Sequence, residues 1–83
     1  MGAMMSGRLR TETAEFAEYD VNAPGVFPEG ATRVVRVPVQ GPAGYSINDA
    51  EYEYTGKRAA MIIWKRRMEA GGQWPKTFFF ASG

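Results

Sequence analysis

Three acidic residues near the middle of the chain are the side chains whose types could support acid–base chemistry. Asp49, Glu51 and Glu53 lie within five positions of one another. Two carboxylates can act as general acid and general base, but a catalytic site also needs a nucleophile, an electrophile or a phosphate-binding loop. The sequence places none of these beside the three acids. We therefore predict no catalytic residues and no enzymatic activity.

The sequence also lacks the residues on which phosphate-binding loops and metal sites usually depend. The segment TGKR at positions 55–58 ends like a P-loop, but the glycine required five positions before Gly56 is replaced by Glu51. The chain contains no cysteine and no histidine, which removes the usual zinc ligands, a thiolate nucleophile and the commonest general base. No calcium-binding D-x-D-x-D-G pattern occurs either. We expect neither a cofactor nor a metal site.

A basic segment, KRAAMIIWKRR at positions 57–67, is the strongest indication of nucleic-acid binding. On a helical wheel its cations are scattered around the axis, whereas a helix that binds phosphates carries its cations on one stripe. Those at positions 65–67 also lie in the last turns of the predicted helix, where cations complement the helix dipole. Nucleic-acid binding is therefore the second hypothesis, with Arg58, Lys65, Arg66, Arg67 and Lys76 as its candidate residues.

Exposed aromatic side chains offer a different source of binding energy, because tryptophan, tyrosine and arginine dominate protein interfaces. Trp74 flanks a glycine turn, and Phe79 should point away from the neighbouring phenylalanines of its strand. Tyr52 and Tyr54 share a face if positions 51–55 form a strand. Core packing is the competing interpretation for each aromatic residue. The candidate partner-binding residues are Trp74, Phe79, Tyr52, Tyr54, Lys65, Arg66 and Arg67.

These candidates favour a non-catalytic protein-binding module that acts as a small adaptor, or as a regulator or inhibitor of a larger protein machine. A nucleic-acid-binding protein and a structural subunit of a larger assembly are the alternatives. The first two differ in their response to salt, because phosphate binding weakens steeply as ionic strength rises, whereas an aromatic-anchored protein contact does not. Another protein is thus the expected partner, nucleic acid is the alternative partner, and no membrane partner is expected.

The charges of the chain are distributed unevenly, although its formal net charge is only +1. Positions 11–53 carry eight acidic and two basic side chains, whereas positions 54–83 carry six basic and one acidic side chain. The two parts can neutralise each other on folding, or they can present an acidic and a basic face. We expect mutual neutralisation, because mixed-charge surfaces are the norm.

Two strands are predicted before the helix. Positions 11–21 fit either a strand or a helix, and a strand is favoured, while the proline and glycine residues at 22–30 indicate turns. Positions 31–40 are the clearest strand, with Val35 and Val37 on one face and Arg36 on the other. Pro38 has no N–H to donate to a neighbouring strand. This strand therefore lies at an edge of the sheet, or Pro38 occupies a position where an N–H would point to solvent.

One main helix includes positions 58–70. It begins at Ile47 after a capping box of Ser46 and Asp49, or at Gly56 if positions 51–55 form a short strand. Glycines at positions 71 and 72 end it. Its core-facing residues should be Ile63, Ala59 and Ala60.

The last predicted strand covers positions 76–82. Phe78 and Phe80 should share one face and Phe79 the other, so both faces need cover unless the outer face is functional. A central position in the sheet would supply that cover. Exposure of Phe79 would instead mark a binding surface.

The sequence thus predicts a small single α+β domain, with about three strands in an antiparallel or mixed sheet and one main helix across it, in β-β-α-β order. Positions 11–83 form this domain, and positions 1–10 are assigned to a flexible N-terminal segment whose start is typical of vector-derived residues. The segment has no apolar run long enough for a signal peptide. Together with the absence of cysteine, this favours a cytoplasmic protein.

Overall fold

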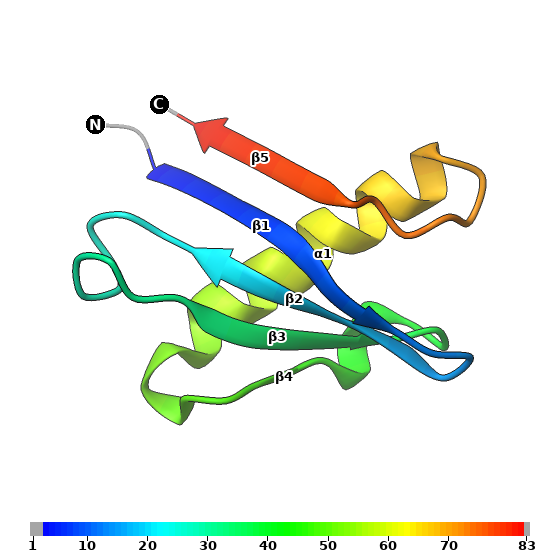
Figure 1. Ribbon diagram of the computed structural model, residues 1–83, viewed down its shortest axis with the longest axis horizontal. Coiled ribbons are helices and arrows are strands. Elements are labelled where there is room, and N and C mark those ends of the chain that lie inside the picture. The colour runs from blue at the N-terminus through cyan, green and yellow to red at the C-terminus, as the bar shows by residue number, and fades with distance from the viewer. Residues whose placement is uncertain (1–2, 83) are drawn as a thin grey trace.

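The chain folds into a five-stranded antiparallel sheet with one helix across one face, in a computed structural model that describes residues 3–82 (Figure 1). The strands are β1 (Ala3–Glu12), β2 (Phe16–Asn22), β3 (Arg33–Pro38), β4 (Ser46–Ile47) and β5 (Thr77–Ser82), in the order β4-β3-β2-β1-β5. The helix is α1 (Glu53–Glu69), and short 3₁₀ helices cover Pro42–Gly44 (η1) and Ala50–Tyr52 (η2). The predicted small α+β domain is confirmed, but the sheet has five strands rather than about three.

Strand β1 lies inside the sheet, between β2 and β5, so the flexible segment predicted for positions 1–10 is wrong over residues 3–10. The sequence concealed this strand because one of its inward positions is a glycine. A β-carbon on Gly7 would overlap the Phe78 ring, which comes from β5 and covers this position. The inward position that Gly7 leaves without a side chain is therefore filled by Phe78, from the other end of the chain.

Alternating apolar residues of the central strands form the core between the sheet and α1. Tyr19 contributes the largest fully buried side chain, and its hydroxyl donates a 2.5 Å hydrogen bond to the Pro75 carbonyl. The predicted core face of the helix is confirmed. The fully buried residues of β2, β3 and α1 are Ala17, Tyr19, Val21, Val35, Val37, Ala59, Ala60 and Ile63.

Helix α1 begins at neither of the predicted positions. The Asp49 side chain accepts a hydrogen bond from the Glu51 N–H and starts the 3₁₀ turn η2, which leads into α1 at Glu53. The segment 51–55 is therefore helical rather than extended, and Tyr52 and Tyr54 do not share a strand face. The helix ends as predicted, with Gly71 and Gly72 at φ values of 72° and 98° that favour glycine.

Pro38 does not place β3 at an edge, because β3 pairs with β2 on one side and β4 on the other. The Val34 N–H points toward the β4 side, so the even-numbered residues of β3 face that way. β4 pairs only with Val35 and Arg36 and ends before reaching Pro38. The missing N–H of Pro38 therefore costs no ladder bond, and the Pro38 ring lies beside Gly44 of η1.

The three phenylalanines of β5 alternate as predicted, although the strand is not central. Phe78 is buried, Phe79 is 58% exposed and Phe80 is half-buried. β5 is an edge strand, and α1 crosses only the sheet face to which Phe78 points (Figure 1). Among residues 3–82, no helix is long and apolar enough to cross a membrane.

Candidate interaction surface

The side of α1 that faces away from the sheet carries apolar and cationic side chains on one narrow stripe. At about 100° per residue, Tyr54, Met61 and Met68 fall within roughly 40° of one another, and Lys57 and Lys65 border them on either side. We call these five residues the helix stripe. It lies opposite Ile63, the buried centre of the inward face.

The three apolar members of the helix stripe are strongly exposed. Tyr54 is 74% exposed, Met61 54% and Met68 62%. Large apolar side chains gathered on one face are unusual on an isolated protein and are typical of interaction sites. Methionine also adapts its flexible side chain to partners of different shape.

An apolar groove adjoins the stripe on the side of the loop that follows β3. It has a volume of about 510 Å³, and the 3₁₀ helix η1 forms its outer wall. The Tyr45 hydroxyl donates a 3.3 Å hydrogen bond to the Glu53 carbonyl and ties this loop to the start of α1. The groove is lined by Gly41, Pro42, Ala43, Tyr45, Lys57 and Met61.

The two lysines of the helix stripe have no carboxylate within 4.0 Å in the part of the chain that the structure describes, residues 3–82. Three of the acids at positions 11–53 pair with arginines of β1 and β3: Arg10 with Asp20, Arg36 with Glu18 and Arg33 with Asp49, at 2.8–3.2 Å. In the second half Arg66 pairs with Glu69 at 3.7 Å. Over residues 3–82 no ion pair joins positions 11–53 to positions 54–83. Each of the first three pairs joins residues that are close in the fold. Two of them link neighbouring strands, and the Arg33–Asp49 pair links β3 to the turn that starts η2.

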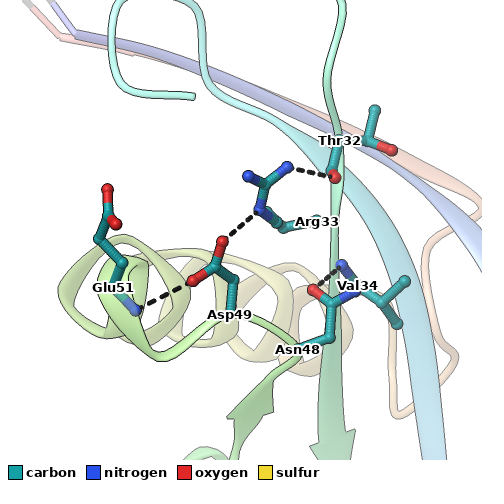
Figure 2. Close-up of polar contacts among 6 residues, drawn as sticks. All are labelled: Thr32, Arg33, Val34, Asn48, Asp49 and Glu51. Atoms are coloured by element: carbon teal, nitrogen blue, oxygen red, sulfur yellow. Dashed lines mark hydrogen bonds and ion pairs between the residues drawn. The ribbon is translucent and has the colours of Figure 1, made fainter. Parts of the chain in front are cut away.

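Of the three acids considered for catalysis, Asp49 and Glu51 lie at the start of η2 (Figure 2), and Glu53 is the first residue of α1. One oxygen of Asp49 accepts from the Arg33 Nε at 3.0 Å, and the other accepts from the Glu51 N–H at 3.1 Å. Glu51 and Glu53 are exposed. Asp49 thus closes the turn before α1.

Tyr52 belongs to the same structural cluster rather than to the stripe. Its ring packs edge-on against Phe27 at 4.9 Å, and the Arg33 guanidinium lies 5.1 Å from its centre. Desolvation, together with the charge of Glu51, raises the pKa of Tyr52. Of the two predicted tyrosines, only Tyr54 is available as a large exposed aromatic surface.

Trp74 is buried, with 8% of its surface exposed, so the predicted exposure of this side chain is wrong. The Arg67 guanidinium lies 4.2 Å from the Trp74 ring centre and 5.2 Å from that of Trp64. The two indoles meet edge-on at 6.1 Å, and Arg67 also donates to the Gly72 carbonyl at 2.9 Å. Trp74 and Arg67 therefore hold the turn after α1 against the helix.

The remaining predicted cations lie in two places, at β5 and on the helix stripe. Arg66 donates a 3.1 Å hydrogen bond to the Phe79 carbonyl, which brings two predicted partner-binding residues together at β5. The Arg58 guanidinium lies 5.8 Å from the Phe80 ring. Lys65 belongs to the helix stripe, and Lys76 is exposed just before β5. Arg58, Arg66 and Lys76 thus lie at or beside β5, whereas Arg67 packs on Trp74 and Lys65 borders the helix stripe.

Sequence reasoning missed Lys57, Met61 and Met68 as surface residues. Their signal is the spacing of seven residues that separates Tyr54, Met61 and Met68. That spacing identifies a solvent-facing stripe only when the helix is known to include Tyr54 and to bury Ile63. The sequence left open whether positions 51–55 are helical or extended, and the extended alternative separates Tyr54 from the two methionines.

Comparison of the chain with protein family models, with curated proteins and with solved structures finds no match. In the described part of the chain, no three acidic, histidine or cysteine side chains are grouped to hold a metal ion. The function is therefore inferred from the surface of this chain itself.

Proposed function

We propose that the protein is a non-catalytic protein-binding module whose partner docks on the helix stripe and the adjoining groove. The observation that carries this proposal is the exposure of Tyr54, Met61 and Met68 on one face of α1, at 74%, 54% and 62%. Burying these side chains against a partner removes apolar surface from water, which is the main driving force of association. A domain of this size suits a small adaptor, or a regulator or inhibitor of a larger protein machine.

The charge of the stripe indicates the chemistry of the partner. Lys57 and Lys65 border the apolar side chains, and neither has a carboxylate within 4.0 Å in residues 3–82. A complementary segment presents apolar residues flanked by aspartate or glutamate, as on one face of an amphipathic helix. The two lysines then favour orientation and association rate more than affinity.

The nucleic-acid alternative has less support from the same residues. Arg67 is engaged by two indole rings and a backbone carbonyl, and Arg66 by the Phe79 carbonyl. Lys65 borders the apolar side chains of the helix stripe, and Arg58, seven residues earlier, lies on the same side of α1. An apolar contact bordered by two lysines fits a protein surface better than a phosphate backbone.

The double variant Met61→Gln, Met68→Gln tests the proposed surface. Glutamine keeps the length and helix propensity of methionine, so α1 should remain folded while its apolar surface is lost. We expect the affinity for the partner to fall on the order of 10- to 100-fold, as for the loss of two anchor residues. Quantitative affinity capture from native extract identifies the partner, and titration of the purified partner measures the affinity.

The control is Val26→Thr, which removes apolar surface of nearly the same shape from a residue that is 48% exposed and lies outside the stripe. It should leave partner binding unchanged. Equal binding by the double variant and the wild type would contradict the proposal. Binding of an oligonucleotide or of anionic vesicles would also contradict the proposal, if that binding weakens with salt, depends on Lys65 and occurs without a protein partner.

A further inference from the structure

The two edges of the sheet differ in how well their backbone groups are covered. On one side β4 has only two residues, and beyond it the Asn48 side chain accepts from the Val34 N–H at 2.9 Å (Figure 2). On the other side β5 has six residues, TFFFAS, without a charge or a proline. Natural edge strands usually carry charge, proline or a bulge, or are very short, because a bare edge pairs with other strands.

The backbone of β5 presents alternate residues to that open edge. The Leu9 N–H donates to the Lys76 carbonyl at 2.8 Å, which shows that Lys76 faces β1. By alternation Phe78 and Phe80 also face β1, whereas Thr77, Phe79 and Ala81 direct their N–H and C=O groups outward. The contact of Arg66 with the Phe79 carbonyl, at 3.1 Å, agrees with this direction.

An exposed apolar corner lies beside the open edge on the sheet face opposite α1. Met4 is 49% exposed and Phe79 58%, and Ala81 is exposed next to Met4. We call Met4, Phe79 and Ala81 the apolar corner. It faces away from the helix stripe, so an inference about it does not rest on the proposed function.

We propose that β5 pairs antiparallel with β5 of a second copy of this chain, which joins the two sheets into one. A two-fold axis places Phe79 opposite Phe79 of the second copy and Thr77 opposite Ala81 of the second copy. Every outward N–H and C=O of these residues then has a partner. The two Phe79 rings become cross-strand neighbours, an arrangement that stabilises antiparallel pairs.

The observed register explains why a second copy fits this edge. Met4 is paired with Ala81 and Arg8 with Thr77 within one copy. The two-fold axis therefore forms a row across the interface of Arg8 and Thr77 from one copy and Ala81 and Met4 from the other. No charged residue meets a like charge in these rows. A strand of another protein could satisfy the same backbone groups, but a second copy brings the two apolar corners together and buries both.

Arg66 makes this association weak and adjustable. Its guanidinium donates to the Phe79 carbonyl, which pairing with a second copy requires. When the guanidinium leaves that carbonyl, Glu69, 3.7 Å away, remains as its partner. An interface formed by one six-residue strand from each copy buries little surface. We therefore expect a dissociation constant on the order of 10–100 µM.

Analytical ultracentrifugation over about a hundredfold range of concentration, reaching hundreds of micromolar, tests the proposal. The wild type should shift from monomer to dimer. Ala81→Pro removes an outward N–H without breaking a hydrogen bond to β1 and should stay monomeric, and Phe79→Lys should do the same by placing two cations at the axis. Arg66→Ala should tighten the dimer by about threefold or more, because the Phe79 carbonyl loses its competitor.

Amide exchange supplies a second readout, since the N–H groups of Phe79 and Ala81 should gain protection as the concentration rises. Met61→Gln, Met68→Gln serves as the control and should dimerise like the wild type. A wild type that is monomeric throughout would overturn the proposal. Dimerisation that survives both edge variants, or that is lost in the methionine variant, would also overturn it.

Discussion

Tyr19 shows how one residue links the core to the end of the chain. Its side chain is fully buried, and its hydroxyl donates to the Pro75 carbonyl at 2.5 Å. Burial raises the pKa of Tyr19 well above its ordinary value, and the charge of Glu12 acts in the same direction. At neutral pH the hydroxyl is therefore protonated and donates, and it fixes the segment that leads into β5.

Replacing Tyr19 by Phe should lower the free energy of unfolding at neutral pH by about 1–2 kcal/mol, because the Pro75 carbonyl loses its donor. At alkaline pH the raised pKa has a second effect. The unfolded tyrosine releases its proton near pH 10, before the folded one does, so stability is full below about pH 10 and falls as the pH rises further. Tyr19→Phe should flatten that fall by up to about 1.4 kcal/mol per pH unit.

Urea denaturation from neutral to strongly alkaline pH measures both effects. Part of the slope should persist in the variant, because the pKa of Tyr52 is raised as well. Identical slopes for wild type and variant would show that Tyr19 does not carry the alkaline transition.

At the scale of elements, the pairing of β1 with β5 depends on a fit between a glycine and an aromatic ring. Phe78 is buried, packs edge-on against Tyr19 at 6.1 Å and covers Gly7 on the inner face of the sheet. Such cover compensates a glycine in a strand, which otherwise contributes no side chain to packing. The ring is held on both sides and has little room to move.

Gly7→Ala should therefore destabilise the protein by about 1–3 kcal/mol, the usual cost of overpacking a core. Thermal or urea unfolding measures the loss. Ser6→Ala is the matched control, since Ser6 is its neighbour on β1 and points to the opposite face, beside Phe79. A stability for Gly7→Ala equal to that of Ser6→Ala would mean that the Phe78 ring does not occupy this site.

For the whole molecule, β1 has a central role because it joins β5 to the rest of the sheet. The first and last strands of the chain are thus neighbours (Figure 1). β1 also contributes the buried Met5 to the core. The fold is therefore completed only when both ends of the chain are in place.

Deleting residues 1–8 should abolish cooperative unfolding and the near-ultraviolet circular dichroism of the packed aromatics. Without that part of β1, β5 loses its hydrogen-bonded neighbour and Phe78 loses its cover. Deletion of residues 1–3 is the control, because it preserves the pairs from Met4 and Ala81 onward. A cooperative transition of near-native stability after the longer deletion would restore the view that this segment is flexible.

The sequence by itself determined the features that follow from local backbone geometry. The alternation of Phe78, Phe79 and Phe80, the inward arc around Ile63 and the end of α1 at its glycines were all predicted, because strand and helix periods act over a few residues. The lack of cysteine and histidine is likewise a fact of the sequence alone.

Only the tertiary structure decided which surfaces these elements bury and which they leave exposed. Trp74 is covered by Arg67 and Trp64, Gly7 by Phe78, and β5 is left at an edge. Each of these outcomes depends on contacts between elements rather than on a repeat along one strand or helix. The helix stripe depends on the observed start of α1 at Glu53, and the apolar corner depends on the sheet order, so neither could be assigned from the sequence alone.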